Sequence, residues 1–251
     1  VDVDAHVTDF HVSWYAQSPF IAHMLLHGKS SLTNGDQTIQ AANEAIQSDI
    51  LQSKFLDVNA WDICQEEWNR EKLVSRMISA VVTGDIPVIL NPVVYHKFDG
   101  IPHQGRADVL HRVQNGVDSG HQYMVKVVTC QVGQGLRPYM VMKAMFFHYV
   151  LSSMLGKDHA KLHHRVAIIL GDASEIEFDS RDHRRVVKAQ CVELQKLWKT
   201  SEAPTPSAQD LRLSRNFAQV AYKQLLQEDS LELVPCLKLG HKRQLCKHGL
   251  G

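Results

Sequence analysis

The spacing of hydrophobic and polar residues predicts alternating helices and strands along most of the chain. In residues 36–58 (DQTIQAANEAIQSDILQSKFLDV), apolar side chains including Ile39, Ile46 and Phe55 fall near one helical stripe. A second helix is predicted over residues 62–79. The run at 165–171 (RVAIILG) is unbroken and apolar, which is typical of a strand buried on both faces.

Prolines also shape the pattern. Pro87 and Pro92 fall within one apolar run, and they predict a strand that is either at a sheet edge or interrupted. Residues 201–207 (SEAPTPS) combine two prolines with small polar residues, so we predict a linker there. This gives a main domain over 1–200 and a C-terminal helix with a basic tail over 208–251.

The stretch from Gly105 to Tyr149 carries the most chemical information. It predicts a strand bearing Asp108, a hairpin connection, a second strand over 123–130 and a helix that opens near Pro138.

A long helix is predicted after Asp179 or Ser180. Its predicted core stripe comprises Val186, Val187, Gln190, Leu194, Leu197 and Trp198. The densest basic patch of the chain lies on the same helix, at Arg181, Arg184, Arg185 and Lys188. Two interpretations stay open for this patch: ordinary solvated helix charge, or contact with the phosphates of a nucleic acid.

Composition limits the alternatives. The 251 residues carry a net charge of zero, so no global basic field marks the chain as one that coats nucleic acid. Five widely spaced Cys do not form a disulfide framework, which favours a reducing, intracellular compartment. No apolar run approaches the ~20 residues of a membrane span. The chain begins at Val1, and a removed mitochondrial targeting peptide is one explanation beside a cleaved or longer protein.

The tail offers the second set of candidate ligands. Cys236, His241, Cys246 and His248 are residue types that bind zinc, but their spacing is not that of a usual zinc knuckle. We therefore expect no zinc there. Lys242 and Arg243, within the same tail, could contact an anionic partner.

The order of these features resembles the RecB-like branch of the PD-(D/E)xK nucleases. The matching residues are GRADVLHRV, then YMVKVVTCQ, and then a helix opening with Arg137-Pro138. The resemblance implies an α/β, restriction-endonuclease-like fold with a mixed central sheet flanked by helices. In that family, acids hold Mg²⁺ and a lysine orients the nucleophile. Asp108 keeps its acid here, whereas Thr129 stands at the second acid, Gln131 at the lysine, and Lys143 at a helix glutamine.

Other family positions are changed as well. Gln52 is the best match to a helix glutamate beside the metal. Ser18 and Leu239 stand at two of the four cysteines that hold an iron–sulfur cluster in part of the family, so the resemblance implies that this cluster is lost. Asp108 alone should hold Mg²⁺ poorly, so we expect no resident cofactor.

Two hypotheses follow. In the first, the chain is a pseudonuclease that serves as a structural or nucleic-acid-binding subunit, with protein partners and RNA or DNA, for example in a mitochondrial ribonucleoprotein such as a ribosome. In the second, it is an active Mg²⁺- or Mn²⁺-dependent nuclease, in which Glu44, Asp49, Glu66 or another carboxylate joins Asp108. Lys126 or Lys143 would then replace the missing lysine, and Lys143 is favoured because strand alternation places Lys126 on the opposite face from Gln131.

Overall fold

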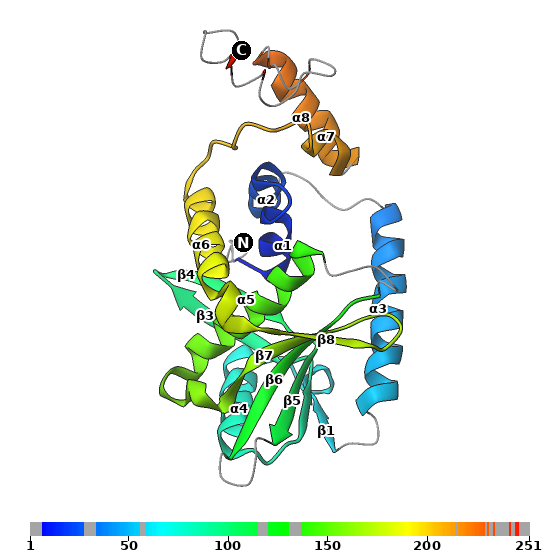
Figure 1. Cartoon of the computed structure of the whole chain (residues 1–251), viewed down its shortest axis with the longest axis vertical. Coiled ribbons are helices and arrows are strands. Elements are labelled where there is room, and N and C mark those ends of the chain that lie inside the picture. Colours follow the sequence, from blue (N-terminus) through cyan, green and yellow to red (C-terminus); the bar gives the residue numbers. More distant parts are fainter. Residues whose placement is uncertain are drawn as a thin grey trace.

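The computed structural model shows an α/β fold in which helices flank a mixed central sheet (Figure 1). It describes residues 7–27, 34–55, 59–114, 120–130, 137–213 and 215–228, with positions 230, 233, 241, 244 and 245. The sheet and its flanking helices confirm the fold class expected from the sequence.

The central sheet has six strands in the order β1-β2-β5-β6-β7-β8. Their bounds are β1 Ala60–Asp62, β2 Val88–Leu90, β5 Val109–Gln114, β6 His121–Val128, β7 Leu162–Ile169 and β8 Glu175–Asp179. The pairs β1–β2 and β6–β7 are parallel and the other neighbours are antiparallel. A separate hairpin pairs β3 (Val93–Phe98) with β4 (Ile101–Arg106).

Eight α-helices and two 3-10 helices complete the described part of the chain. The α-helices are α1 Asp9–Tyr15, α2 Pro19–Leu26, α3 Asn34–Phe55, α4 Arg70–Thr83, α5 Pro138–Leu155, α6 Ser180–Lys199, α7 Asp210–Leu213 and α8 Arg215–Gln227. The 3-10 helices are Ile63–Gln65 and Gly156–Lys161. Within the described residues, no helix combines the length and apolar character of a membrane span.

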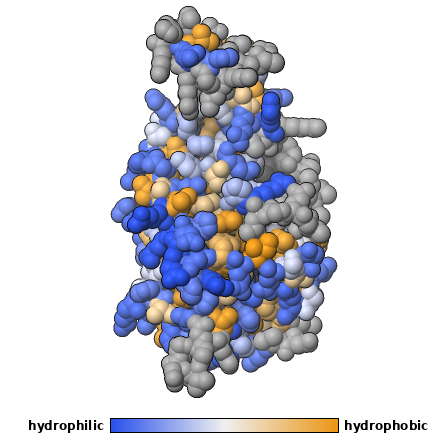
Figure 2. Space-filling view, in the orientation of Figure 1, coloured by the Kyte–Doolittle hydropathy of each residue, from blue (hydrophilic) through white to orange (hydrophobic). Residues whose placement is uncertain are grey.

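Helices α3 and α5 cover opposite faces of the sheet. Val125 and Val127 of β6 belong to the main core, together with Phe147 of α5. Val128 belongs instead to a smaller cluster with Phe55 of α3. Successive strand residues point to opposite faces, so this alternation separates the two helices (Figure 1). The face of the molecule seen in Figure 2 is mostly hydrophilic, with separate hydrophobic patches.

Two predicted helices differ from the observed ones. The helix predicted at 62–79 begins at Arg70, because Asp62 ends strand β1 and the Asn69 side chain caps the helix by accepting the Lys72 N–H at 3.0 Å. On α3, the predicted stripe residue Ile46 is 41% exposed.

The predicted core stripe of α6 was wrong at Val186, which is 50% exposed. Val187, Cys191 and Leu194 form the buried stripe, at the i, i+4, i+7 spacing of one helical face.

Pro92 interrupts the apolar run, whereas Pro87 lies directly before β2. Asn91 and Pro92 separate β2 of the central sheet from β3 of the hairpin, and β2 lies inside the sheet rather than at its edge.

The C-terminal helix packs back on the N-terminal region. Phe217 and Ala221 of α8 form a buried cluster with Phe20 and Ile21 of α2. The segment 201–207 contains neither helix nor strand, and its Pro206 is buried.

Candidate functional site

The candidate site is centred on Asp108, at the corner between β4 and β5. Asp108 lies directly before β5 rather than inside a strand. Its Oδ2 accepts a hydrogen bond from the Val128 N–H at 2.7 Å, at the end of β6. This hydrogen bond holds the half-buried Asp108 carboxylate against β6.

Lys143 of α5 and Asp9 of α1 join Asp108. The Lys143 Nζ lies 3.9 Å from Asp9 Oδ2 and 4.0 Å from Asp108 Oδ2. The three side chains keep only 27%, 22% and 15% of their surface exposed, in the order Lys143, Asp9, Asp108. We call these three residues the acid–lysine cluster. It places one ammonium group within ion-pair distance of two carboxylates.

Local sequence explains how α1 reaches this position. The Thr8 side chain caps α1 by accepting the His11 N–H, so Asp9 begins the helix. At Gly105, an added Cβ would lie 3.0 Å from Asp9 Oδ1 and 2.9 Å from Phe147 Cε1. The glycine of the G-R-A-D motif therefore lets Asp9 and α5 approach β4 closely.

The charges within the cluster depend on one another. Burial raises the pKa of Asp9; the Lys143 ammonium opposes this increase and the Asp108 charge adds to it. For Lys143, burial lowers the pKa, but Asp108 and Asp9 outweigh it, so the net pKa is raised. Lys143 is therefore a cation at neutral pH, and its charge partly offsets the effect of burial on the pKa of Asp9.

Helix α3 contributes Gln47 rather than Gln52. The Gln47 Nε2 donates to the Val128 carbonyl at 3.0 Å, so it binds the same residue whose N–H binds Asp108. Gln52 is exposed and donates to Ser48 at 3.5 Å. Thr129 follows β6, where its backbone N–H donates to the Ile169 carbonyl at 2.8 Å. Gln131 lies outside the described residues.

Lys126 is not part of the cluster. Its side chain, 8% exposed, donates to Glu175 at 2.8 Å, and Glu175 also binds Lys54 of α3 at 2.9 Å. Lys126 thus ties β6 to β8 on the side of the sheet that α3 covers. This agrees with the expectation that strand alternation turns Lys126 away from the predicted site.

The residues predicted to bind nucleic acid on α6 are exposed. Arg181 is occupied by Asp179, because its guanidinium forms several hydrogen bonds to that carboxylate. Arg184, Arg185 and Lys188 are exposed on the same helix.

Most candidate ligands of the tail lie outside the part of the chain that the structure describes. Cys236, Lys242, Arg243, Cys246 and His248 lie outside the described residues, and His241 is exposed. Within the described part of the chain, no group of three or more His, Cys, Asp or Glu lies close enough to hold a metal ion.

Ser18 has a structural role of its own. It is 2% exposed and caps α2 by accepting the Ile21 N–H at 3.0 Å, ahead of Pro19 at the first helical position. A hydroxyl at this position therefore stabilises a helix start, which explains why serine fits it.

Sequence reasoning missed Asp9 and Gln47. Asp9 was not among the predicted site residues, because its neighbours Asp108 and Lys143 are about 100 residues away in sequence or more. Gln47 carried a weak signal: it shares a helix with Gln52, and a shift of five residues would have selected it.

No protein-family model matches the chain, and no curated protein sequence matches it. Among solved structures, SSO0001 is similar over 88% of this chain and 86% of that chain, with a TM-score of 0.44 and 13% sequence identity.

Proposed function

We propose that the chain is a catalytically inactive relative of the RecB-like PD-(D/E)xK nucleases and acts as a structural or nucleic-acid-binding subunit of a larger assembly. The observation that carries the proposal is the position of Lys143. Its ammonium lies within 4.0 Å of both acids, where it supplies the positive charge that a metal ion supplies in an active nuclease.

The residues of the cluster fit a divalent metal poorly. A metal ion would have to compete with the Lys143 ammonium for both carboxylates. The metal ion would also have to share Asp108 Oδ2 with the Val128 N–H, which donates to it at 2.7 Å. At the second acid position, Thr129 offers a neutral hydroxyl, and Mg²⁺ selects charged oxygen ligands. The acid–lysine cluster is better suited to hold α1, α5 and the β4–β5 corner together.

One observation favours the second hypothesis, an active nuclease with a rearranged site. Asp9 is the additional carboxylate that this hypothesis requires, and Lys143 is the lysine that it favoured. In that case Asp9 and Asp108 would hold the metal ion. The raised pKa of Asp9, caused first by burial, opposes metal binding, since a carboxylate must be ionised to act as a ligand.

Cleavage assays decide between the two. Labelled single-stranded and duplex DNA and RNA are incubated with Mg²⁺ or Mn²⁺, and the wild type is compared with Asp108→Ala and Asp9→Ala. We expect no cleavage by the wild type above the level of either variant, with folding checked by circular dichroism. Cleavage that both substitutions abolish would establish the active nuclease and refute the proposal. Glu177→Ala, which removes an exposed acid on β8, is the matched control.

A further inference from the structure

A partly exposed strip of cations and aromatic rings crosses the β3–β4 hairpin and the start of α4. Tyr95 pairs with Gln104 across the hairpin, and Val93 pairs with Arg106. Residues two apart on a strand share a face, as do directly opposed residues, so Tyr95, Lys97, Gln104 and Arg106 all lie on one face of the hairpin. This face meets Arg70 and Trp68, which precede or begin α4.

An arginine guanidinium group lies over each aromatic ring of the strip. The Arg70 guanidinium lies 4.1 Å from the centre of the Tyr95 ring, and that of Arg106 lies 4.8 Å from the Trp68 ring. Arg70 also donates to the Gln104 side chain at 3.4 Å, which connects the two pairs. We call Lys97, Tyr95, Arg70, Gln104, Arg106 and Trp68 the hairpin strip.

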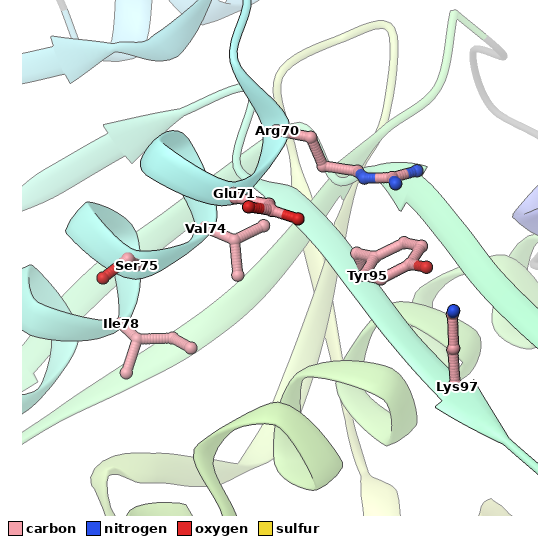
Figure 3. A pocket seen from close by; sticks show the side chains of 7 residues that line it. All are labelled: Arg70, Glu71, Val74, Ser75, Ile78, Tyr95 and Lys97. Carbon is pink, nitrogen blue, oxygen red and sulfur yellow. The ribbon is translucent and has the colours of Figure 1, made fainter.

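The strip borders two hollows on either side of α4. One, of about 490 Å³, is lined by Tyr95, Arg70 and Lys97 together with the apolar Val74 and Ile78. Figure 3 shows the Arg70 guanidinium and the Lys97 amine approaching the Tyr95 ring from opposite directions. The other, of about 150 Å³, is lined in part by Trp68. Trp68 is 57% exposed, although it is a large apolar side chain.

The charges of the strip are not neutralised locally. Within the described part of the chain, Arg70, Lys97 and Arg106 have no carboxylate within 4.0 Å. By contrast, the nearby Arg76 is paired with Glu66 at 2.6 Å. Glu71 lines the larger hollow, and Glu66 and Glu67 line the smaller one, but Glu66 is the acid that pairs with Arg76.

We infer that the hairpin strip binds single-stranded nucleic acid, with bases stacked on Trp68 and Tyr95 and phosphates held by Arg70, Lys97 and Arg106. Cations that follow the backbone and aromatic rings that accept bases are the two requirements for binding single strands without sequence preference. A duplex keeps its bases stacked inside and cannot use the rings. This inference rests on the proposed function in the variant where the subunit binds nucleic acid, and it adds the binding surface and the type of strand.

The α6 patch is the rival site. Arg184, Arg185 and Lys188 offer cations, but no aromatic ring of the described chain stacks with them. A helix of this kind supports phosphate contact alone, which does not distinguish single strands from duplexes.

The test measures fluorescence anisotropy of labelled single strands of about 20 nucleotides, as DNA and as RNA, in roughly 50 mM salt. The variants are Trp68→Leu, Trp68→Phe, Arg106→Gln and the pair Arg185→Gln/Lys188→Gln. Arg165→Gln is the control, because Arg165 is exposed and ion-paired with Glu177 at 3.3 Å. Melting temperatures establish that each variant is folded.

We expect Trp68→Leu to weaken binding about fivefold or more, since stacking on one ring contributes at least that factor per base. Trp68→Phe should restore most of the affinity. Arg106→Gln should reduce the slope of log affinity against log salt by about 0.7, the contribution of one phosphate contact to a single strand, while Trp68→Leu leaves that slope unchanged. Comparing the affinities for single-stranded DNA and single-stranded RNA shows which of the two the protein prefers.

Three results would overturn the inference: no binding of single strands by the folded wild type, tighter binding of duplex than of single strand, or a loss confined to the Arg185/Lys188 variant. The cleavage assay reports separately on the proposed function. A wild type that cleaves refutes the pseudonuclease and leaves the strip in place. A wild type that neither cleaves nor binds refutes the strip and leaves a structural subunit.

Discussion

Replacing Lys143 by Met tests whether its ammonium is the built-in counter-ion of Asp9 and Asp108. Met keeps most of the side-chain volume and removes the charge. Each pair, at close to 4 Å, has a Coulomb energy of about 4 kcal/mol at an effective dielectric constant of 20, part of which desolvation cancels. Removing one partner of a buried pair costs about 3–5 kcal/mol.

The cost of removing Lys143 should be below that range, because the three side chains keep 15–27% of their surface exposed and no short hydrogen bond joins them. We therefore expect the free energy of unfolding to fall by about 2 kcal/mol at neutral pH. For a chain of this size, the melting temperature should fall by about 4–8 °C.

The loss of stability in Lys143→Met should depend on pH. Because the pKa of folded Asp9 is raised above its unfolded value, this group favours the folded state most when protonated, and that contribution is lost as pH rises through the folded pKa. Without Lys143 the pKa of Asp9 rises further. Urea unfolding should therefore show a larger difference between wild type and variant at about pH 8 than at about pH 5.

Divalent cations provide the second measurement. With the ammonium gone, the acid pair is open to Mg²⁺ or Mn²⁺, and a cation at about ten times its dissociation constant stabilises by about 1.4 kcal/mol. We expect Mg²⁺ to raise the melting temperature of Lys143→Met and not that of the wild type. Equal stabilisation of both proteins, or a Lys143→Met variant as stable as the wild type at every pH, would refute the counter-ion role.

Two further predictions concern the supporting structure. Gln47→Ala should lower the free energy of unfolding by about 1 kcal/mol through loss of its bond to the Val128 carbonyl, whereas Gln52→Ala, on the exposed face of α3, should change it little in urea unfolding; equal effects would argue against a role for Gln47. Burial lowers the pKa of His103 to about 4 from its ordinary 6.5, so stability should be lost as pH falls from about 6.5 to 4, by on the order of 3 kcal/mol. In His103→Met this acid dependence should shrink between pH 7 and about 4.5, and an unchanged dependence would contradict the prediction.

Local signals in the sequence account for much of the fold. The apolar run at 165–171 predicted β7, and the structure buries Val166 through Leu170. Hairpin signals and the Arg-Pro step predicted β5, β6 and the start of α5. These predictions succeed because strand burial, turns and helix starts depend on residues that are adjacent in sequence. The helix predicted at 62–79 was wrong over residues 62–69, where Asp62 pairs in β1, Ile63–Gln65 form a 3-10 helix and Asn69 caps α4.

The sequence by itself determined the element types, the acid at 108 and the neutral residues at 129 and 131, since each is a property of one residue or of a short window. Only the tertiary structure decided which groups surround Asp108. Helix α1 brings Asp9, α5 brings Lys143 and α3 brings Gln47. Helices α5 and α3 pack against opposite faces of one sheet, and α1 packs against α5. The hairpin strip also depends on the tertiary structure. The β3–β4 register and the start of α4 bring its residues together, whereas strand alternation in the sequence does not show that they are neighbours. Charges and rings act through distance in space, and the sequence specifies only distance along the chain.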